Sequence, residues 1–238
     1  MLRRVLLLLV LLSLLSGTAQ ARHLTIGMPF LNDSCRFPVV EAFFREAYSR
    51  VGMEADFLSL PSRLELEFAD SGRTDASLLR TELVASEHRE LVKVPYPLLL
   101  VDFVVCTLRK DIRISRVAEL ARYRVGVSRG DLTASMLCGK AGVTPVQVNS
   151  LKSGVRMMEE GRLDVILEER NTVELVKAQL GKPLFLSAPL HQARLYHWLN
   201  KRNAYLAGPL AEAFKAVIAE GKGGQVFGTC PAPSAQPR

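Results

Sequence analysis

The feature that most constrains the fold is a unit that occurs twice, in which an amphipathic stretch ends at glycine and an apolar stretch opens on aspartate. The first copy is Ser71-Gly72-Arg73-Thr74-Asp75-Ala76-Ser77-Leu78-Leu79-Arg80, and the second is Glu160-Gly161-Arg162-Leu163-Asp164-Val165-Ile166-Leu167-Glu168-Glu169. A glycine in the left-handed conformation commonly ends a helix, and the apolar residues that follow predict a strand. The two glycines lie about 90 residues apart, so the repeat predicts two similar lobes.

A charged residue stands eight positions after each glycine, Arg80 in the first copy and Glu169 in the second. A cation and an anion at matching strand ends predict opposing walls of a cleft that binds a small polar ligand. A salt bridge between the lobes, or one on the surface, is the alternative interpretation of these two residues. Glu168 and Glu169 are adjacent on a strand and point to opposite faces, which argues against a catalytic pair of carboxylates.

Segments with strand and helix character alternate along the chain, which is typical of an α/β fold. Apolar segments at 101–108 and 188–198 predict two crossings between the lobes. We therefore expect a discontinuous first lobe of residues 22–104 and 190–230 and an inserted second lobe of residues 105–189. Residues 231–238 are rich in proline and alanine and are expected to be disordered.

Residues 1–21 have the form of a secretory signal peptide. Arg3 and Arg4 precede an apolar run from Val5 to Leu15, and an A-x-A cleavage site ends at Ala21. This run is short for a membrane span, which disfavours the alternative of an uncleaved anchor. We expect an exported, periplasmic protein.

Four cysteines follow this segment, at Cys35, Cys106, Cys138 and Cys230. In an exported chain they predict either disulfides, with three possible connectivities, or buried thiols. No C-x-x-C pair and no suitably spaced histidine accompanies them, so we expect neither a metal site nor a cofactor. The formal net charge is +7, but the basic residues are scattered without interleaved aromatics, which argues against a nucleic-acid partner.

Several short motifs occur in a characteristic order: Leu24-Thr25-Ile26-Gly27, Gly72-Arg73-Thr74-Asp75-Ala76, Tyr123-Arg124-Val125-Gly126-Val127 and Gly161-Arg162-Leu163-Asp164-Val165. Their order and spacing resemble the family 3 solute-binding proteins, the periplasmic receptors of polar amino-acid ABC transporters. The resemblance spans residues 24 to 228, approximately. It implies the two-lobed type II periplasmic-binding fold, with a hinge of two crossing segments. It also implies a monomer that captures an amino acid or related metabolite for a membrane permease.

The resemblance also implies which residues hold the ligand. The family uses an arginine after the third strand, which is either Arg80 or Arg89 here, since Ser86-Glu87-His88-Arg89 is nearest to the family's Thr-x-x-Arg. It uses backbone amides and a hydroxyl at the helix start after Val-Gly-Val, where this chain has Ser128 and Asp131. Glu169 takes the place of the family's aspartate, and Phe30 or Asn32 would line the first lobe. Asp131 would repel a carboxylate unless it caps the helix or meets an amine.

Two other functions stay open. Exported dehydratases of the prephenate or arogenate type are similar to this family, and in them an acid near the position of Glu169 donates a proton. A protein that senses a solute for a separate partner is the other alternative. No Ser-His-Asp, Cys-His or paired-carboxylate constellation accompanies Glu169, so we expect a protein without catalytic activity.

Overall fold

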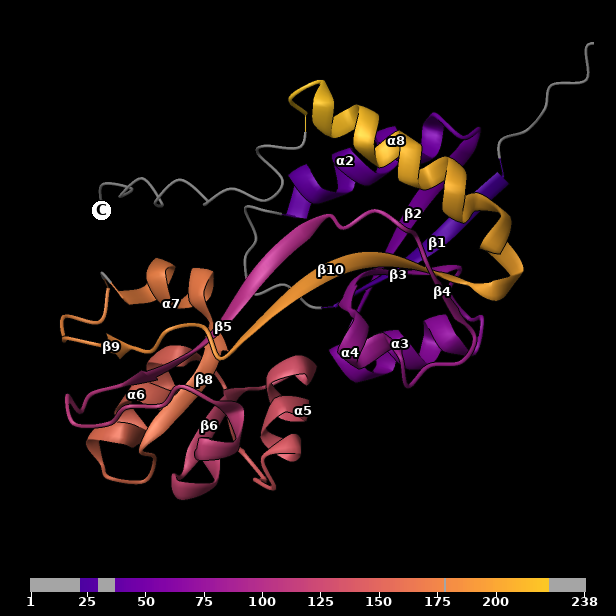
Figure 1. Ribbon diagram of the computed structural model, residues 1–238. Helices are drawn as coiled ribbons and strands as arrows, with labels where there is room; N and C mark the ends of the chain where they lie inside the picture. The colour runs from indigo at the N-terminus through magenta and orange to yellow at the C-terminus, as the bar shows by residue number, and fades with distance from the viewer. Residues whose placement is uncertain (1–21, 30–36, 178, 223–238) are drawn as a thin grey trace, which may run out of the picture.

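The computed structural model describes residues 22–29, 37–177 and 179–222. They form two α/β lobes connected by two long antiparallel strands, β5 (Leu99–Thr107) and β10 (His191–Asn200) (Figure 1). The predicted fold class is therefore confirmed, and the two predicted crossing segments overlap β5 and β10. Phe30, Asn32, Cys35, Cys230, the predicted signal peptide and the predicted disordered tail lie outside the described residues.

The chain builds most of the first lobe, then the second, and returns to the first through β10. The first lobe contains β1 (Arg22–Pro29), α2 (Phe37–Ser49), β2 (Met53–Leu60), α3 (Ser62–Asp70), β3 (Ala76–Thr81), α4 (Glu82–Ala85), β4 (Leu91–Lys93), the 3₁₀ helix η2 (Lys201–Leu206) and α8 (Ala207–Ala219). The second lobe contains the 3₁₀ helix η1 (Val117–Arg122), β6 (Val125–Ser128), α5 (Leu132–Lys140), β7 (Val146–Val148), α6 (Leu151–Glu159), β8 (Val165–Glu169), α7 (Arg170–Lys177) and β9 (Phe185–Leu186).

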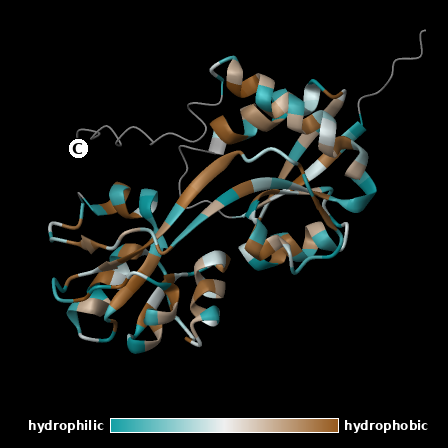
Figure 2. Ribbon diagram, in the orientation of Figure 1, coloured by the Kyte–Doolittle hydropathy of each residue, from teal (hydrophilic) through white to brown (hydrophobic). Residues whose placement is uncertain are grey.

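One continuous sheet runs through both lobes, in the order β2-β1-β3-β10-β5-β8-β6-β7. In the first lobe α2 and α8 pack on one face of the sheet, and α3 and α4 cover the other. In the second lobe η1 and α5 lie on one face, and α6 and α7 on the other. Apolar side chains concentrate along β5 and β8, as Figure 2 shows. Each lobe thus has two apolar layers of its own.

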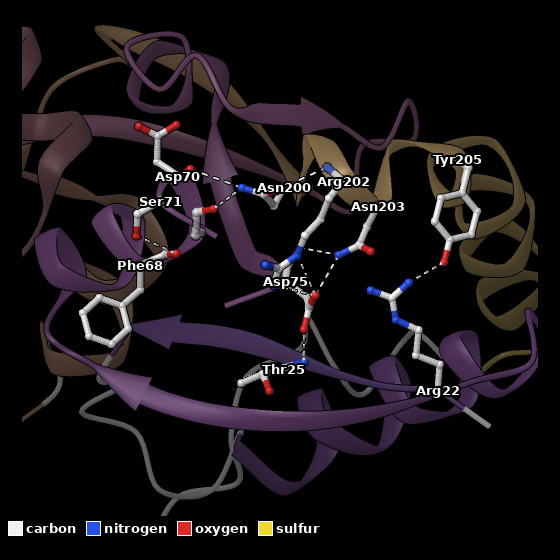
Figure 3. A network of polar contacts seen from close by, with 11 residues as sticks. Arg22, Thr25, Phe68, Asp70, Ser71, Asp75, Asn200, Arg202, Asn203 and Tyr205 are labelled. Carbon is white, nitrogen blue, oxygen red and sulfur yellow. Dashed lines mark hydrogen bonds and ion pairs between the residues drawn. The ribbon is translucent and has the colours of Figure 1, made fainter. Parts of the chain in front are cut away.

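The aspartate of the repeat makes equivalent hydrogen bonds and ion pairs in both lobes. The carboxylate of Asp75 accepts the backbone N–H of Thr25 at 2.9 Å and pairs with Arg202 at 2.8 Å (Figure 3). Asp164 accepts the backbone N–H of Arg124 and pairs with its guanidinium, both at 2.9 Å. Each aspartate therefore ties the start of its own strand to the neighbouring parallel strand. The strands begin at Ala76 and Val165, each directly after its aspartate.

His197 on β10 is fully buried in the core of the first lobe. Its Nδ1 lies 2.9 Å from the carbonyl oxygen of Leu78, to which it donates, so Nε2 accepts the hydroxyl of Tyr48 at 2.7 Å. Burial lowers the pKa of His197 to about 4. The imidazole is therefore neutral and serves as an internal polar link between α2 and the sheet.

Two of the four cysteines are described, and both are buried free thiols. Burial raises the pKa of Cys106 to about 12 and that of Cys138 to about 11. Thiols with such values carry almost no thiolate at neutral pH and are poor nucleophiles. The sequence left open whether the cysteines form disulfides or are buried thiols. Cys106 and Cys138 are buried thiols.

The burial of His197 predicts a pH-dependent stability. The imidazole in the unfolded chain binds its proton near pH 6.5, whereas the folded one binds it near pH 4. The unfolded state holds more protons between these values, so the free energy of unfolding should fall by about 3 kcal/mol as the pH falls from 7 to 4. Denaturant unfolding at half-unit pH steps measures this loss. The double variant Tyr48→Phe/His197→Leu should lack this component, and His23→Gln, at an exposed histidine, should keep it. An unchanged slope in the double variant would contradict the assignment.

Candidate functional site

The two lobes touch each other beside the crossing strands. The hydroxyls of Thr81, which ends β3, and Thr133, on α5, lie 3.0 Å apart. Leu132 and Met136 of α5 pack against the apolar cluster under α3 and α4 of the first lobe. Leu83 of α4 packs in return against the core of the second lobe. The helices α4 and α5 therefore form the contact between the lobes (Figure 1).

The start of α3 and the turn before α5 also face each other across this junction. A side chain at Gly130 would place its Cβ 3.4 Å from the hydroxyl of Ser62. Gly130 also has a φ of +89°, a conformation that other residues rarely adopt. Glycine at this position therefore permits the turn, and Ser62 lies at ordinary contact distance from it. The carboxyl ends of β3, β6 and β8 converge on the same region.

Three acids and a serine gather at the ends of β6 and β8 in the second lobe. Ser128 donates its hydroxyl to Glu168 Oε2, and the backbone N–H of Glu169 donates to Glu168 Oε1 at 3.0 Å. Asp131 caps α5, because its carboxylate accepts the N–H of Ala134 at 2.8 Å. The structure thus brings together Ser128, Asp131 and Glu169, all three of which the sequence predicted as ligand-binding residues.

The environment of these acids disfavours their charges. Burial raises the pKa of Asp131 well above its ordinary value, and the carboxylates of Glu168 and Glu169 raise it further. Burial also raises the pKa of Glu168, although hydrogen bonds from Ser128 and Glu169 oppose the shift. Among the described residues, no basic side chain pairs with Asp131 or Glu168. We call Ser128, Asp131, Glu168 and Glu169 the acidic wall; a cationic group beside it would relieve the repulsion.

Arg80 lies near the end of β3 and is 8% exposed. Its Nε donates to Glu65 Oε2 at 3.0 Å, and its Nη2 donates to the same oxygen and to the carbonyl oxygen of Ser62, the latter at 3.1 Å. Glu65 is completely buried. The charge of Arg80 is therefore compensated within the first lobe. The alternative interpretation of the sequence was a salt bridge that involves Arg80 and Glu169. In the structure Arg80 forms its salt bridge with Glu65 instead.

The structure does not bring Arg89 to the acidic wall. Arg89 is exposed in the turn before β4, and Leu91 at the start of β4 pairs with Asn200. Asn200 follows Leu199, which pairs with Ala76 at the beginning of β3. Arg89 thus lies near Ala76, at the beginning of β3, and not near Thr81 at its end, because the chain reverses direction after α4.

Sequence reasoning did not single out Glu65 or Glu168 as site residues. Glu65 occupies an inward position of α3 beside the buried Leu66 and Ala69. An acid on the apolar stripe of a helix is the signal that would have found it. Glu168 ends a run of buried apolar residues in β8, and its turn toward Ser128 depends on the tertiary structure.

Within residues 22–29, 37–177 and 179–222, no group of three or more His, Cys, Asp or Glu side chains has the arrangement of a metal site. No helix in the same ranges has both the length and the apolar character that crossing a bilayer requires.

No protein-family model matches the chain. An uncharacterized protein of Shewanella oneidensis is 22% identical over 208 residues, which make up 83% of this chain and 78% of that protein.

Solved structures resemble the whole architecture. A histidine kinase sensor domain with similarity to periplasmic binding proteins matches with a TM-score of 0.67 and 16% identity, over 87% of this chain and 95% of that one. An ancestral arginine-binding protein bound to arginine matches with a TM-score of 0.64 and 14% identity, over 86% and 96%. The GluR0 ligand-binding core of Nostoc punctiforme, in complex with L-glutamate, matches with a TM-score of 0.66 and 13% identity, over 85% and 96%. These likenesses show that the chain has the two-lobed fold of periplasmic binding proteins.

The acidic wall predicts a stabilising substitution. Burial raises the pKa of Glu168 and of Asp131 in the folded state, and nearby carboxylates raise that of Asp131 further, so ionisation of these groups removes stability as the pH rises through their folded pKa values. Glu168→Gln keeps an oxygen that can accept a hydrogen bond and removes one charge. At pH 8 we expect the Tm to rise by about 2–4 °C, the shift that about 1 kcal/mol produces in a chain of this size.

Differential scanning calorimetry at pH 8 and pH 4.5 measures this effect, which should shrink at the lower pH. Glu212→Gln, at an exposed acid on α8, is the matched control and should leave Tm unchanged at both values. A fall in Tm at pH 8 for Glu168→Gln would show that the hydrogen bonds of Glu168 outweigh its charge repulsion.

Proposed function

We propose that the protein is an exported solute-binding protein that captures a small polar solute with a cationic group between its lobes. The observation that carries the proposal is the acidic wall, in which Asp131 and Glu168 have no basic partner among the described residues. The wall lies at the junction of two lobes connected by β5 and β10, where closure of the lobes would surround a solute. Several proteins with the same fold bind arginine or glutamate, which supports a solute of similar size.

The charge of the site favours a cation over an anion. Asp131, Glu168 and Glu169 contribute negative charge from the second lobe, and the positive charge of Arg80 in the first lobe is compensated by Glu65. An amine or guanidinium group would donate hydrogen bonds to the carboxylates at short range and low dielectric. An anionic solute would be repelled by the carboxylates of Asp131 and Glu168, which have no basic partner among the described residues.

A permease of the ABC type is the proposed recipient of the solute, following the resemblance of the sequence motifs to family 3 solute-binding proteins. The alternative recipient is a sensor protein, and the likeness to a histidine kinase sensor domain supports this alternative. Neighbouring genes that encode a permease and an ATPase would favour transport, and a neighbouring signalling gene would favour sensing.

A thermal-shift screen tests the solute class. We expect L-arginine or 1,4-diaminobutane to raise the Tm and L-glutamate to leave it unchanged. At one hundred times the dissociation constant the stabilisation is about 2.7 kcal/mol, which is several degrees here. Glu168→Gln should reduce the shift and Glu212→Gln should preserve it. Stabilisation by L-glutamate alone would contradict the proposed charge preference, and no stabilisation by a wide panel of solutes would overturn solute binding.

A dehydratase is the second candidate function, because burial raises the pKa of Glu168 and Asp131 and a protonated carboxyl can act as a general acid. We propose that binding proceeds without turnover. Incubation with prephenate or arogenate, followed by detection of the aromatic product, should show no conversion above the uncatalysed rate. Conversion that Glu168→Gln or Glu169→Gln abolishes would establish the enzyme instead.

A further inference from the structure

A carboxylate is buried in the first lobe, away from the acidic wall. Glu65 on α3 is 0% exposed, and its Oε1 has no hydrogen-bond partner among the described residues. The hydroxyls of Thr74 and Ser77 are buried and unpartnered in the same sense. Burying a carboxylate is costly unless a cation and hydrogen bonds compensate it. The cation here is Arg80.

Glu65, Thr74 and Ser77 form a buried polar layer in the first lobe. In the second lobe the corresponding layer is apolar. The residues 89 positions further along the repeat are Gly154, Leu163, Ile166 and Glu169, which correspond to Glu65, Thr74, Ser77 and Arg80. A Cβ at Gly154 would lie 2.6 Å from Ile166 Cδ1, so apolar side chains fill this layer in the second lobe. The fold is therefore satisfied by apolar residues at these positions, and packing alone does not require Glu65.

A glycine lets Glu65 approach the sheet. A Cβ at Gly27 on β1 would lie 2.9 Å from Glu65 Oε1 and 3.3 Å from Thr74 Oγ1. The corresponding glycine of the second lobe is Gly126, which likewise follows by two residues the backbone N–H that the repeat aspartate binds. A Cβ at Gly126 would instead meet Leu163 Cδ1 at 2.7 Å. Both lobes thus need a small residue here, but only in the first does it accommodate a carboxylate.

We infer that Glu65 is the positioning residue of Arg80 in solute binding. It holds the guanidinium against the start of α3, where Nη2 also binds the carbonyl oxygen of Ser62, and it compensates the charge of Arg80 beside the cleft. Ser62 in turn lies against Gly130, next to Asp131. Glu65 thereby keeps the first lobe electrically neutral opposite the acidic wall, and the cleft as a whole selects a cation.

This inference rests on the proposed function, since it gives Glu65 a role in the affinity for a cationic solute. Without Glu65, Arg80 would carry an uncompensated charge at the lobe junction and would repel an incoming cation. The effect of removing Glu65 must therefore depend on the presence of Arg80. That dependence separates a positioning role from a role in folding alone.

Titration calorimetry with 1,4-diaminobutane tests the inference on the full chain. Glu65→Gln is nearly isosteric and should raise the dissociation constant at least tenfold. Thr74→Val alters the same buried layer without touching Arg80 and should keep the constant within twofold. The double variant Glu65→Gln/Arg80→Gln should bind at least threefold more tightly than Glu65→Gln alone, because the uncompensated charge is gone. In ¹H–¹⁵N spectra we expect the Nε–H of Arg80 to exchange slowly with solvent in the wild type, because Glu65 accepts its hydrogen bond, and to exchange faster in Glu65→Gln.

Each outcome decides between the inference and the proposed function. Wild-type protein that binds none of the cationic probes overturns the proposed function and with it the role of Glu65 in affinity. Wild-type protein that binds, together with a Glu65→Gln variant of equal affinity, overturns the positioning role alone. If Glu65→Gln does not fold, the double variant is compared with Arg80→Gln. Their constants should agree within twofold, and a further loss in the double variant would show that Glu65 does not act through Arg80.

Discussion

The architecture depends on a carboxylate that ties two parallel strands together at their beginnings. Asp75 and Asp164 each accept the backbone N–H of the neighbouring strand and pair with an arginine. The contact sets the register of each lobe at the end of the sheet far from the acidic wall. Because the strands start at a fixed point and have similar lengths, their carboxyl ends carry Arg80 and Glu169 to matching places. The repeat thus acts on the site indirectly, through strand position.

The two lobes have the same strand arrangement but different charges at the strand ends. In the second lobe the layer beneath the strand ends is apolar, and the charges lie above it in Glu168, Glu169 and the cap of α5. In the first lobe the same layer is polar, and Glu65 compensates the one buried cation. Under the proposed function, the neutral pair of Glu65 and Arg80 opposite the acidic wall favours a cation more than acidity alone would, because the charge of Arg80 is already compensated.

Much of this fold follows from the sequence, because hydrophobic periodicity and glycine placement are local signals. The crossing segments predicted at 101–108 and 188–198 begin and end within three residues of β5 and β10. The pattern did not reveal α4 or η2, which are short and lack a repeating apolar face. Ser128, Asp131 and Glu169, which the family resemblance implied as ligand-binding residues, lie near one another. The partner of Arg80 was not predictable, since the contact between α3 and β3 depends on how the helix packs over Gly27.

Because the unit occurs in both lobes, comparing the lobes shows which of its residues the fold requires. Where both lobes have the same residue, as with the aspartates and the strand glycines, the fold itself accounts for it. Where they differ, as at Glu65 and Gly154, the difference must have another cause, since the backbone is satisfied either way. Buried polar groups cost stability when an apolar layer would serve, and Glu65, Thr74 and Ser77 each have a buried atom without a hydrogen-bond partner in the described part of the chain. That cost lies directly behind Arg80, near the end of β3, and this position is why we infer that Glu65 serves Arg80 and not the fold alone.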